Sequence, residues 1–583
     1  MARDNLEKNT ELQFKRSIVN MKIIIIGGVA GGATAATRLR RLNEEAEIII
    51  FERSGFVSYA NCGLPYYIGG EIIDKEELTL QTPESFERRF KIDVRTYHEV
   101  TKINSEAKTV SVHDIKSNKT FEESYDKLIL APGANPVKTN FSAMNSDKVF
   151  TLRTVEDTFR IREFIDYNNP KTAVIIGGGF IGLEMAENLK KRGIDVTIVQ
   201  KNYQLLDIMD YDMASFIHSK FRSEGIKLLF GLDVKDIKIN EKQVLICADC
   251  MEPIRADMVI VSIGVVPENT LAKDAGLALG IKGAINVNDK MQTSNENIYA
   301  VGDAVEVKHY ITNDKTVIAL AGPANKQGRI AADNICGINS KYKGSQGSSV
   351  IKLFDMTAAS TGINETQAKH SNINYEKVIL SPLSHAGYYP GAKVMTLKVL
   401  YEKETLKILG AQCIGYKGVD KRIDVLATAI YAGLTADKLK DLDLSYAPPY
   451  SSAKDPVNMA GFIIDNIEKG IVKQFYYEDL LELEIKSDVT LLDTRTEYEF
   501  VRGHCEGFIN IPLDSLRERI SEIDKSKPVY IMCQSGLRSY LATRILMQKG
   551  FDSYNFVGGY WLYSSIHKEQ LLASNVFACG MEK

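Results

Sequence analysis

The stretch Lys22-Ile-Ile-Ile-Ile-Gly-Gly-Val-Ala-Gly-Gly32 decides the fold of the first part of the chain, because an apolar strand runs straight into a glycine-rich turn. Residues 33–41 then have a helical pattern, and residues 48–52 form a second apolar strand that ends in Glu52. Glycines let the backbone approach a pyrophosphate, and a helix that begins at the turn favours negative charge. Glu52 follows Gly32 at about the 20-residue interval at which a carboxylate binds a ribose. The unit predicts a dinucleotide-binding domain, although Val29 replaces the middle glycine of the usual pattern.

A second unit of the same kind begins at residue 172. Its turn carries the full glycine pattern at Gly177, Gly179 and Gly182, between an apolar strand and a helix over residues 183–189. After the next strand, the position that would bind the ribose of NADH holds Gln200, which is followed by Lys201. Without an acid and with a single lysine, the sequence leaves NADH and NADPH both open.

Composition excludes several classes of protein. The 583 residues are 44% hydrophobic and 25% charged, which is typical of a soluble globular chain of three or four domains. A net charge of −3 gives no reason to expect nucleic acid or an anionic membrane as a partner. Eight scattered cysteines indicate a reducing compartment, so we expect a cytoplasmic protein without a disulfide framework. No apolar run is long enough to span a bilayer, and residues 1–20 read as a flexible, non-globular extension.

A third element, residues 297–304, is a strand that ends in Gly-Asp. With two dinucleotide units before it, residues 21 to about 460 resemble the pyridine nucleotide–disulfide oxidoreductase family. The resemblance implies FAD on the first unit, NAD(P)H on the second, and a dimerisation domain that makes the protein a homodimer. It implies an α/β fold with two Rossmann-like domains and an α+β dimerisation domain. The cofactor-binding residues that it implies are Gly27, Gly32, Glu52, Arg153, Gly177, Gly179, Gly182, Glu184 and Asp303.

Cys62 distinguishes branches within this family. It lies in Ser58-Tyr-Ala-Asn-Cys-Gly-Leu-Pro-Tyr-Tyr-Ile-Gly-Gly70, and Tyr67 stands where glutathione reductase-like members carry a second cysteine. NADH oxidases and peroxidases of the single-cysteine branches carry a histidine in the first glycine turn, where this chain has Val29 and Ala30. The stretch resembles that of coenzyme A-disulfide reductases and the related persulfide reductases. Pro65 suggests that Cys62 lies at a helix N-terminus, where the helix dipole favours a thiolate.

The resemblance also implies residues for coenzyme A and for the thiol chemistry. Residues of the first helix and of the Cys62 stretch would bind coenzyme A: Thr34, Arg38, Arg41, Ser58 and Asn61. A solvated basic face is the alternative for the two arginines. Tyr388 and Tyr446 resemble tyrosines that reach the cysteine of the opposite subunit, where a phenol could protonate a leaving thiolate. They could instead be ordinary interface aromatics, and Tyr389 competes with Tyr388 for the role.

The last part of the chain resembles a rhodanese domain. From about Gln474 the pattern restarts, and Asp493, Arg495, Gly503, His504, Gly507, Asn510 and Pro512 stand in the usual order of that domain. Cys533 begins the loop Cys533-Gln534-Ser535-Gly536-Leu537-Arg538, whose backbone N–H groups would form a nest for a thiolate or persulfide. Phosphatases with a catalytic cysteine need C-x5-R to enclose phosphate, so the shorter C-x4-R suits sulfur. Arg538 either adds positive charge or anchors the loop through a carboxylate.

The remaining cysteines show no motif that indicates a function. Cys247 and Cys250 form a CxxC without a second pair, so zinc is not expected and no metal site is predicted. We expect structural or incidental roles for these two and for the cysteines that lack a supporting motif, which are Cys336, Cys413, Cys505 and Cys579.

The sequence thus predicts six segments. They are the extension 1–20, FAD-binding parts 21–150 and 271–345, an NAD(P)H-binding domain 151–270, a dimerisation domain 346–470 and a rhodanese domain 471–583. The predicted activity is reduction of coenzyme A disulfide, coenzyme A persulfide or polysulfide, with sulfane sulfur carried by the rhodanese. A sulfur relay, a redox sensor and an NADH oxidase remain alternatives. Whether Cys533 passes sulfur to Cys62, across a mobile linker near Gly470 or across a dimer, stays open at this point.

Overall fold

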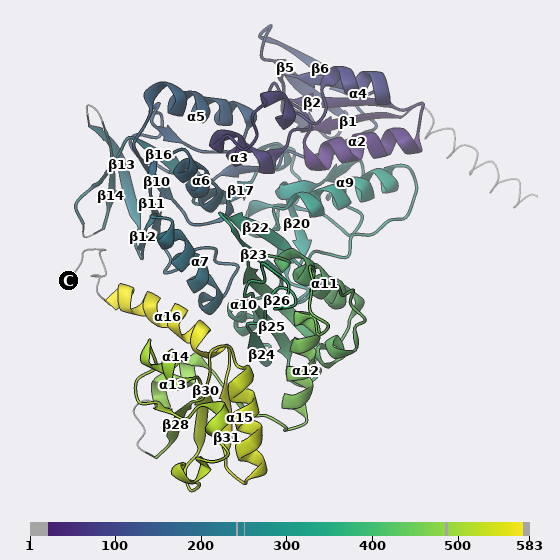
Figure 1. Cartoon of the computed structure of the whole chain (residues 1–583). Coiled ribbons are helices and arrows are strands. Elements are labelled where there is room, and N and C mark those ends of the chain that lie inside the picture. Colours follow the sequence, from purple (N-terminus) through teal and green to yellow (C-terminus); the bar gives the residue numbers. More distant parts are fainter. Residues whose placement is uncertain (1–20, 241–242, 250, 484–487, 575–583) are drawn as a thin grey trace, which may run out of the picture. The chain divides into compact units, whose positions relative to one another are not determined.

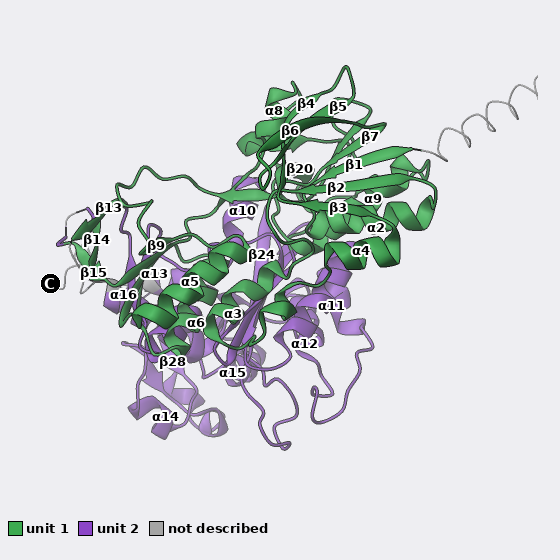
Figure 2. Cartoon of the chain, turned by 90° about the horizontal axis from the view of Figure 1, so that it is seen from above, with its two compact units in different colours: residues 1–197, 234–247, 253–347 green, residues 198–233, 248–252, 348–583 purple. Residues whose placement is uncertain are grey.

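The computed structural model describes residues 21–240, 243–249, 251–483 and 488–574 (Figure 1). The predicted extension 1–20, Cys250 and Cys579 lie outside these residues. The chain forms two compact units (Figure 2): unit 1 takes in residues up to 197, 234–247 and 253–347, and unit 2 takes in 198–233, 248–252 and the remainder. Within the described part, every helix is too short or too polar to cross a membrane.

Unit 1 is built on a five-stranded parallel sheet around the opening strand. Its order is β19 (Ile298–Ala300), β7 (Lys127–Leu130), β1 (Lys22–Ile26), β2 (Glu47–Glu52) and β3 (Asp93–Thr96). Ile23 and Ile25 pack with the helix α2 (Ala30–Leu42), and Ile24 and Ile26 pack on the opposite face. A strand buried on both faces needs a continuous apolar run, which explains the four successive isoleucines.

The second glycine turn lies in the same unit. It follows β10 (Thr172–Ile176), which pairs in parallel with β16 (Met258–Val261), and β16 pairs with β9 (Val149–Phe150). Helix α6 (Phe180–Lys191) begins at this turn and contacts α3 (Leu64–Gly69), which in turn contacts α5 (Val155–Asn168). Because α3 directly follows Cys62, this packing brings Cys62 and the start of α6 together.

Unit 2 contains an antiparallel five-stranded sheet. Its order is β22 (Ser349–Leu353), β23 (Met356–Gly362), β26 (Ile408–Gly415), β25 (Thr396–Glu402) and β24 (Tyr375–Leu380). Helix α11 (Val419–Ala432) packs against β23 and β26, and α12 (Pro456–Glu468) contacts β24. Helix α7 (Tyr211–Ser223) also belongs to this unit and contacts β26.

The C-terminal part of unit 2 is a second parallel sheet, which a short connector joins to α12. The sheet order is β27 (Gln474–Phe475), β31 (Ser553–Phe556), β30 (Val529–Met532), β28 (Thr490–Asp493) and β29 (Ile509–Asn510). Phe475 shares one buried apolar cluster with Ile379 of β24. The C-terminal part therefore packs on the antiparallel sheet through an apolar contact, in addition to the connector around Gly470.

Candidate active sites

The first glycine turn forms a close-fitting cradle. Gly27 has φ +95°, and a Cβ there would lie 2.2 Å from the carbonyl oxygen of Ala131. A Cβ on Gly32 would lie 1.9 Å from the Gly27 oxygen, so only glycine permits this turn. Glu52 is 8% exposed, and its carboxylate accepts the N–H groups of Gly28 (3.0 Å) and Ser54 (2.9 Å). The donor set and the tight turn fit the adenosine half of FAD.

Arg153 and Asp303 lie in unit 1 with this turn. Arg153 donates to the carbonyl oxygens of Pro132 (2.9 Å) and Ala134, in the segment that follows β7. Asp303 is on the one-turn helix η4 (Gly302–Ala304) directly after β19, and burial raises the pKa of its carboxyl group. Ligands of parallel α/β sheets bind beyond the carboxyl ends of the strands, where both side chains lie.

The second glycine turn repeats the close fit. A Cβ on Gly177 would lie 2.4 Å from the Ser262 oxygen, and one on Gly182 would lie 2.0 Å from the Gly177 oxygen. At Gly179 a Cβ would meet nothing within 4 Å, so space is open where a pyrophosphate would approach. In unit 2, Lys201 pairs with Asp233 at 3.1 Å, and the preference between NADH and NADPH remains open.

Cys62 lies in the one-turn helix η1 (Asn61–Gly63) and its side chain is exposed. Partial desolvation raises the pKa of the Cys62 thiol, and the negative charges of Glu184 and Asp303 raise it further. Sequence reasoning placed Cys62 before a helix and expected a favoured thiolate. The helix α3 is there but has six residues, and the two carboxylates oppose its small dipole.

Glu184 is the carboxylate of α6 that acts on Cys62. Burial raises the pKa of Glu184 to about 7, while a hydrogen bond from the Tyr66 hydroxyl (3.3 Å) counteracts this shift. A carboxyl group with this pKa exchanges a proton near neutral pH, which suits general acid–base work. Tyr66 is a site residue that the sequence reasoning missed, although it lies four residues after Cys62 in the same stretch.

We expect Glu184→Gln to lower the pKa of the Cys62 thiol. Glu184 is fully ionised at the alkaline pH where the thiol titrates, so removing its charge stabilises the thiolate. The measurement is the pH dependence of iodoacetamide alkylation at Cys62, read by peptide mass spectrometry on the reduced holoprotein. The midpoint should move to lower pH, whereas Glu76→Gln, which alters an exposed carboxylate, should leave it in place. An unchanged midpoint in Glu184→Gln would contradict the electrostatic assignment.

The predicted coenzyme A residues occupy different environments. Arg38 is half-buried, and its Nε donates to Asp333 at 2.7 Å, so the alternative of a solvated face does not hold for it. Thr34 donates to the amide oxygen of Asn325 at 2.8 Å. Arg41 is exposed, which leaves its guanidinium accessible to a phosphate. Ser58 has φ +48°, and its N–H bonds the Gly28 carbonyl at 2.8 Å, which ties the Cys62 stretch to the first turn.

The two predicted tyrosines meet in unit 2. The hydroxyl groups of Tyr388 and Tyr446 are 2.8 Å apart, and the side chains are 76% and 45% exposed. This hydrogen bond raises the pKa of Tyr446. Tyr389 instead packs edge-on against His385, with ring centroids 5.9 Å apart, which separates it from the pair.

Cys533 lies at the end of β30, at the entrance to helix α15 (Leu537–Gln548), and is 1% exposed. Its Sγ accepts the Gly536 N–H at 3.1 Å and the Ser539 hydroxyl at 3.2 Å. These donors and the start of α15 stabilise negative charge on sulfur. Ser539 is a further site residue missed in the sequence, where it directly follows the loop.

Arg538 anchors the loop. Its guanidinium makes two hydrogen bonds of 2.7 Å to Glu499 of α14 (Glu497–Val501), and this pair lowers the pKa of Glu499 to about 2. Of the two roles considered for Arg538, the structure therefore shows the carboxylate pairing. The remaining loop residues include Gln534, Ser535 and Leu537. The Gln534 amide oxygen lies 3.5 Å from the Arg495 guanidinium, and the Leu537 side chain is 65% exposed.

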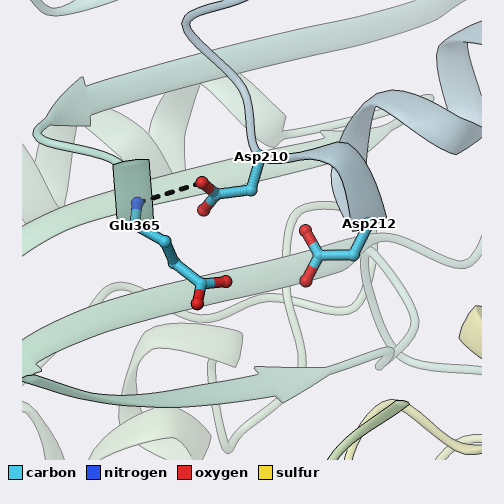
Figure 3. A group of neighbouring side chains, drawn as sticks. All are labelled: Asp210, Asp212 and Glu365. Atoms are coloured by element: carbon cyan, nitrogen blue, oxygen red, sulfur yellow. Dashed lines mark hydrogen bonds between the residues drawn. The ribbon is translucent and has the colours of Figure 1, made fainter. Parts of the chain in front are cut away.

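Three carboxylates of unit 2 lie close together (Figure 3), and Lys398 lies among them. Oxygen atoms of Asp210, Asp212 and Glu365 lie within 4.8 Å of one another, with Asp210 also accepting the Glu365 N–H at 3.0 Å. The fully buried Lys398 Nζ lies 2.9 Å from Asp210 and 2.7 Å from Asp212 and also pairs with Glu365. Burial alone would lower the pKa of Lys398, but the three carboxylates raise it. The cluster holds an ammonium group where a metal ion would need to bind, so we interpret it as structural.

Comparisons with known proteins identify the domains that contain these residues. The pyridine nucleotide-disulphide oxidoreductase pattern matches residues 21–328, its dimerisation domain matches 348–456, and a rhodanese-like domain matches 477–565. The coenzyme A disulfide reductase of Staphylococcus haemolyticus is 40% identical over 442 residues, which cover 76% of this chain and 98% of that protein.

Two solved structures match nearly the whole chain. Reduced Bacillus anthracis CoADR-RHD is 48% identical with a TM-score of 0.91, over 94% of this chain and 99% of that one. A NAD-dependent persulfide reductase from A. fulgidus is 37% identical with a TM-score of 0.88, over 93% and 100% of the two chains. The predicted α/β fold class is thereby confirmed, and the chain belongs to the pyridine nucleotide-disulphide oxidoreductase family, with a rhodanese-like domain at its C-terminal end.

Proposed function

We propose that this chain is an FAD-dependent NAD(P)H oxidoreductase that reduces coenzyme A disulfide, coenzyme A persulfide or polysulfide, and that its rhodanese domain carries sulfane sulfur. The observation that carries the proposal is Cys62, an exposed thiol beside Glu184 and Asp303 with Tyr67 in place of a partner cysteine. Because no second thiol stands in the same stretch, the other sulfur must come from the substrate. Relatives named coenzyme A disulfide reductase and persulfide reductase support this substrate class.

The residues divide the reduction into two steps. The Cys62 thiolate attacks a sulfur–sulfur bond, forms a mixed disulfide, and releases a thiolate from a disulfide or hydrosulfide from a persulfide. FAD, which the first glycine turn, Glu52 and Asp303 would hold, would supply the two electrons of NAD(P)H that break the mixed disulfide. This cleavage leaves Cys62 as a thiolate and releases the second thiol as a thiolate, which takes up a proton. Glu184, with a pKa near 7, can hold the proton for that leaving group.

Coenzyme A and the dimer complete the proposed site. Arg41 would bind the nucleotide end of coenzyme A, and Asn61 would bind its pantetheine end. Thr34 and Arg38 would hold the first helix in place, and Ser58 would hold the backbone of the Cys62 stretch. The dimerisation domain favours a homodimer. In that dimer, the exposed hydroxyl pair of Tyr388 and Tyr446 would donate to sulfur near Cys62 of the partner subunit.

Steady-state kinetics test the proposal. We expect anaerobic oxidation of NADH or NADPH to require coenzyme A disulfide, coenzyme A persulfide or polysulfide, with release of free thiol or sulfide. A sulfur relay or redox sensor predicts little turnover with any of the three. An NADH oxidase predicts rapid oxygen consumption without a sulfur substrate, and either result would overturn the proposed activity.

A further inference from the structure

Helix α16 (Gly559–Ser574) is bonded directly to the Cys533 loop. The Tyr560 N–H donates to the Cys533 carbonyl at 2.7 Å, and the Trp561 N–H donates to the Gln534 carbonyl at 3.0 Å. A Cβ on Gly559 would lie 2.7 Å from the Cys533 oxygen, so the loop and the helix start are as close as glycine allows. Any shift of α16 therefore moves the backbone that presents Cys533.

The same helix is fixed at its far side to α7 (Figure 1). The Ser565 and Ser215 hydroxyls are 2.8 Å apart, and the Trp561 ring stacks on Phe216 with centroids 6.0 Å apart. One helical turn beyond Ser565, the Glu569 carboxylate pairs with Arg222 and lies 3.3 Å from His218 Nδ1. We call these seven residues the α7–α16 contact.

The charged centre of this contact is buried. Glu569 is 3% exposed and His218 is 0% exposed. His218 Nε2 accepts the Leu205 N–H at 3.0 Å, so the imidazole proton lies on Nδ1 and faces Glu569. Burial raises the pKa of Glu569, but His218 and Arg222 lower it, and the net shift is downward. Glu569 is thus a buried carboxylate with an imidazole and a guanidinium as its partners. Removing one member of such a group leaves an uncompensated charge.

We propose that α16 positions the Cys533 loop for sulfur transfer within the chain. Glu569 is a positioning residue, because it fixes α16 to α7 and thereby fixes the loop that is bonded to the start of α16. The inference rests on the proposed function. In the transfer, a thiol acceptor attacks the outer sulfur of the Cys533 persulfide, the sulfur–sulfur bond breaks, and the Cys533 thiolate leaves with a new persulfide on the acceptor. NAD(P)H then reduces that persulfide to thiol and hydrogen sulfide at Cys62. Glu569 touches neither reacting sulfur, and acts only through the position of α16.

Trp561 allows the contact to be observed directly, because it is the single tryptophan of the sequence. In Glu569→Ala and in Phe216→Ala, we expect the tryptophan emission of the holoprotein to shift to longer wavelength at urea concentrations that leave bound FAD in place. Phe216→Ala disturbs the contact from the α7 side without leaving a buried charge, so it serves if Glu569→Ala folds poorly. Glu522→Ala, which breaks an exposed Arg519–Glu522 pair, is the matched control.

Three assays separate positioning from general damage. Thiosulfate–cyanide sulfur transfer reports Cys533 alone, and NAD(P)H oxidation with preformed coenzyme A persulfide reports Cys62 alone. The coupled assay uses thiosulfate, coenzyme A and NAD(P)H and needs both. For the two contact variants we expect the coupled rate to fall about 10-fold or more, because a small misplacement of the reacting groups lowers a rate by that much. Both partial reactions should stay within about 2-fold of the unaltered protein.

Two results would overturn the inference. One is an unchanged coupled rate in a variant whose Trp561 emission has shifted, and the other is an equal loss in all three assays. Failure of the proposed function gives a different pattern, because the unaltered protein would then show no turnover with preformed coenzyme A persulfide.

Discussion

Cys62→Ser should abolish NAD(P)H-dependent reduction of coenzyme A disulfide and persulfide, with a loss of roughly 10³-fold or more, because a hydroxyl group cannot form the mixed disulfide. The measurement is anaerobic NAD(P)H oxidation with each substrate, together with thiol or sulfide release. Binding of FAD and its reduction by NAD(P)H should persist, since neither glycine turn includes Cys62.

Cys336→Ser is the matched control for this change. Cys336 is half-buried at the end of α9 (Ala321–Ile335), and burial raises the pKa of its thiol to about 11, so it is a poor nucleophile. We expect wild-type rates from this variant. Substantial turnover in Cys62→Ser would mean that sulfur is reduced elsewhere, and the proposed route would be wrong.

Cys533→Ser should eliminate sulfur transfer from thiosulfate and the coupled reaction, again by roughly 10³-fold or more, because the persulfide cannot form without the thiolate. Reduction of preformed coenzyme A persulfide should continue at the normal rate. The readouts are thiocyanate formation and NAD(P)H oxidation in parallel. Cys505→Ser, at a buried position of the same domain, is the control, with sulfur transfer expected to persist. Equal loss of both activities in Cys533→Ser would contradict the division of labour between the two thiols.

The sequence predicted those parts of the fold that depend on interactions between residues close together in the chain. An apolar strand, a glycine turn and a helix within about 20 residues can form only a few structures, so both dinucleotide units were expected from their sequences. The strand β30 leading into α15 at Cys533 was equally clear. In each case the glycines and the apolar pattern lie within one short stretch of chain.

Contacts between distant residues could not be read in this way. The Arg538–Glu499 pair and the Arg38–Asp333 pair join residues far apart in sequence, and side-chain identity alone offered several partners for each arginine. The pKa direction at Cys62 was also missed, because Glu184 and Asp303 approach it from other elements of the fold. The sequence around Lys398 did not predict its ion pairs, because its three carboxylates come from other elements. They lie at the N-cap of α7, in the first turn of α7 and at the start of α10 (Glu365–His370).

The apolar contact between Phe475 and Ile379 limits how this chain can be divided. Ile379 is 6% exposed on an edge strand of the antiparallel sheet, and its cluster continues into Tyr477, Leu562 and Ile566 of the C-terminal part. A truncation at Gly470 would bare this strand, and an uncovered apolar edge strand is a template for aggregation. The C-terminal part thus shields the apolar surface of the antiparallel sheet from solvent. A chain truncated at Gly470 would need polar substitutions on β24 to stay soluble.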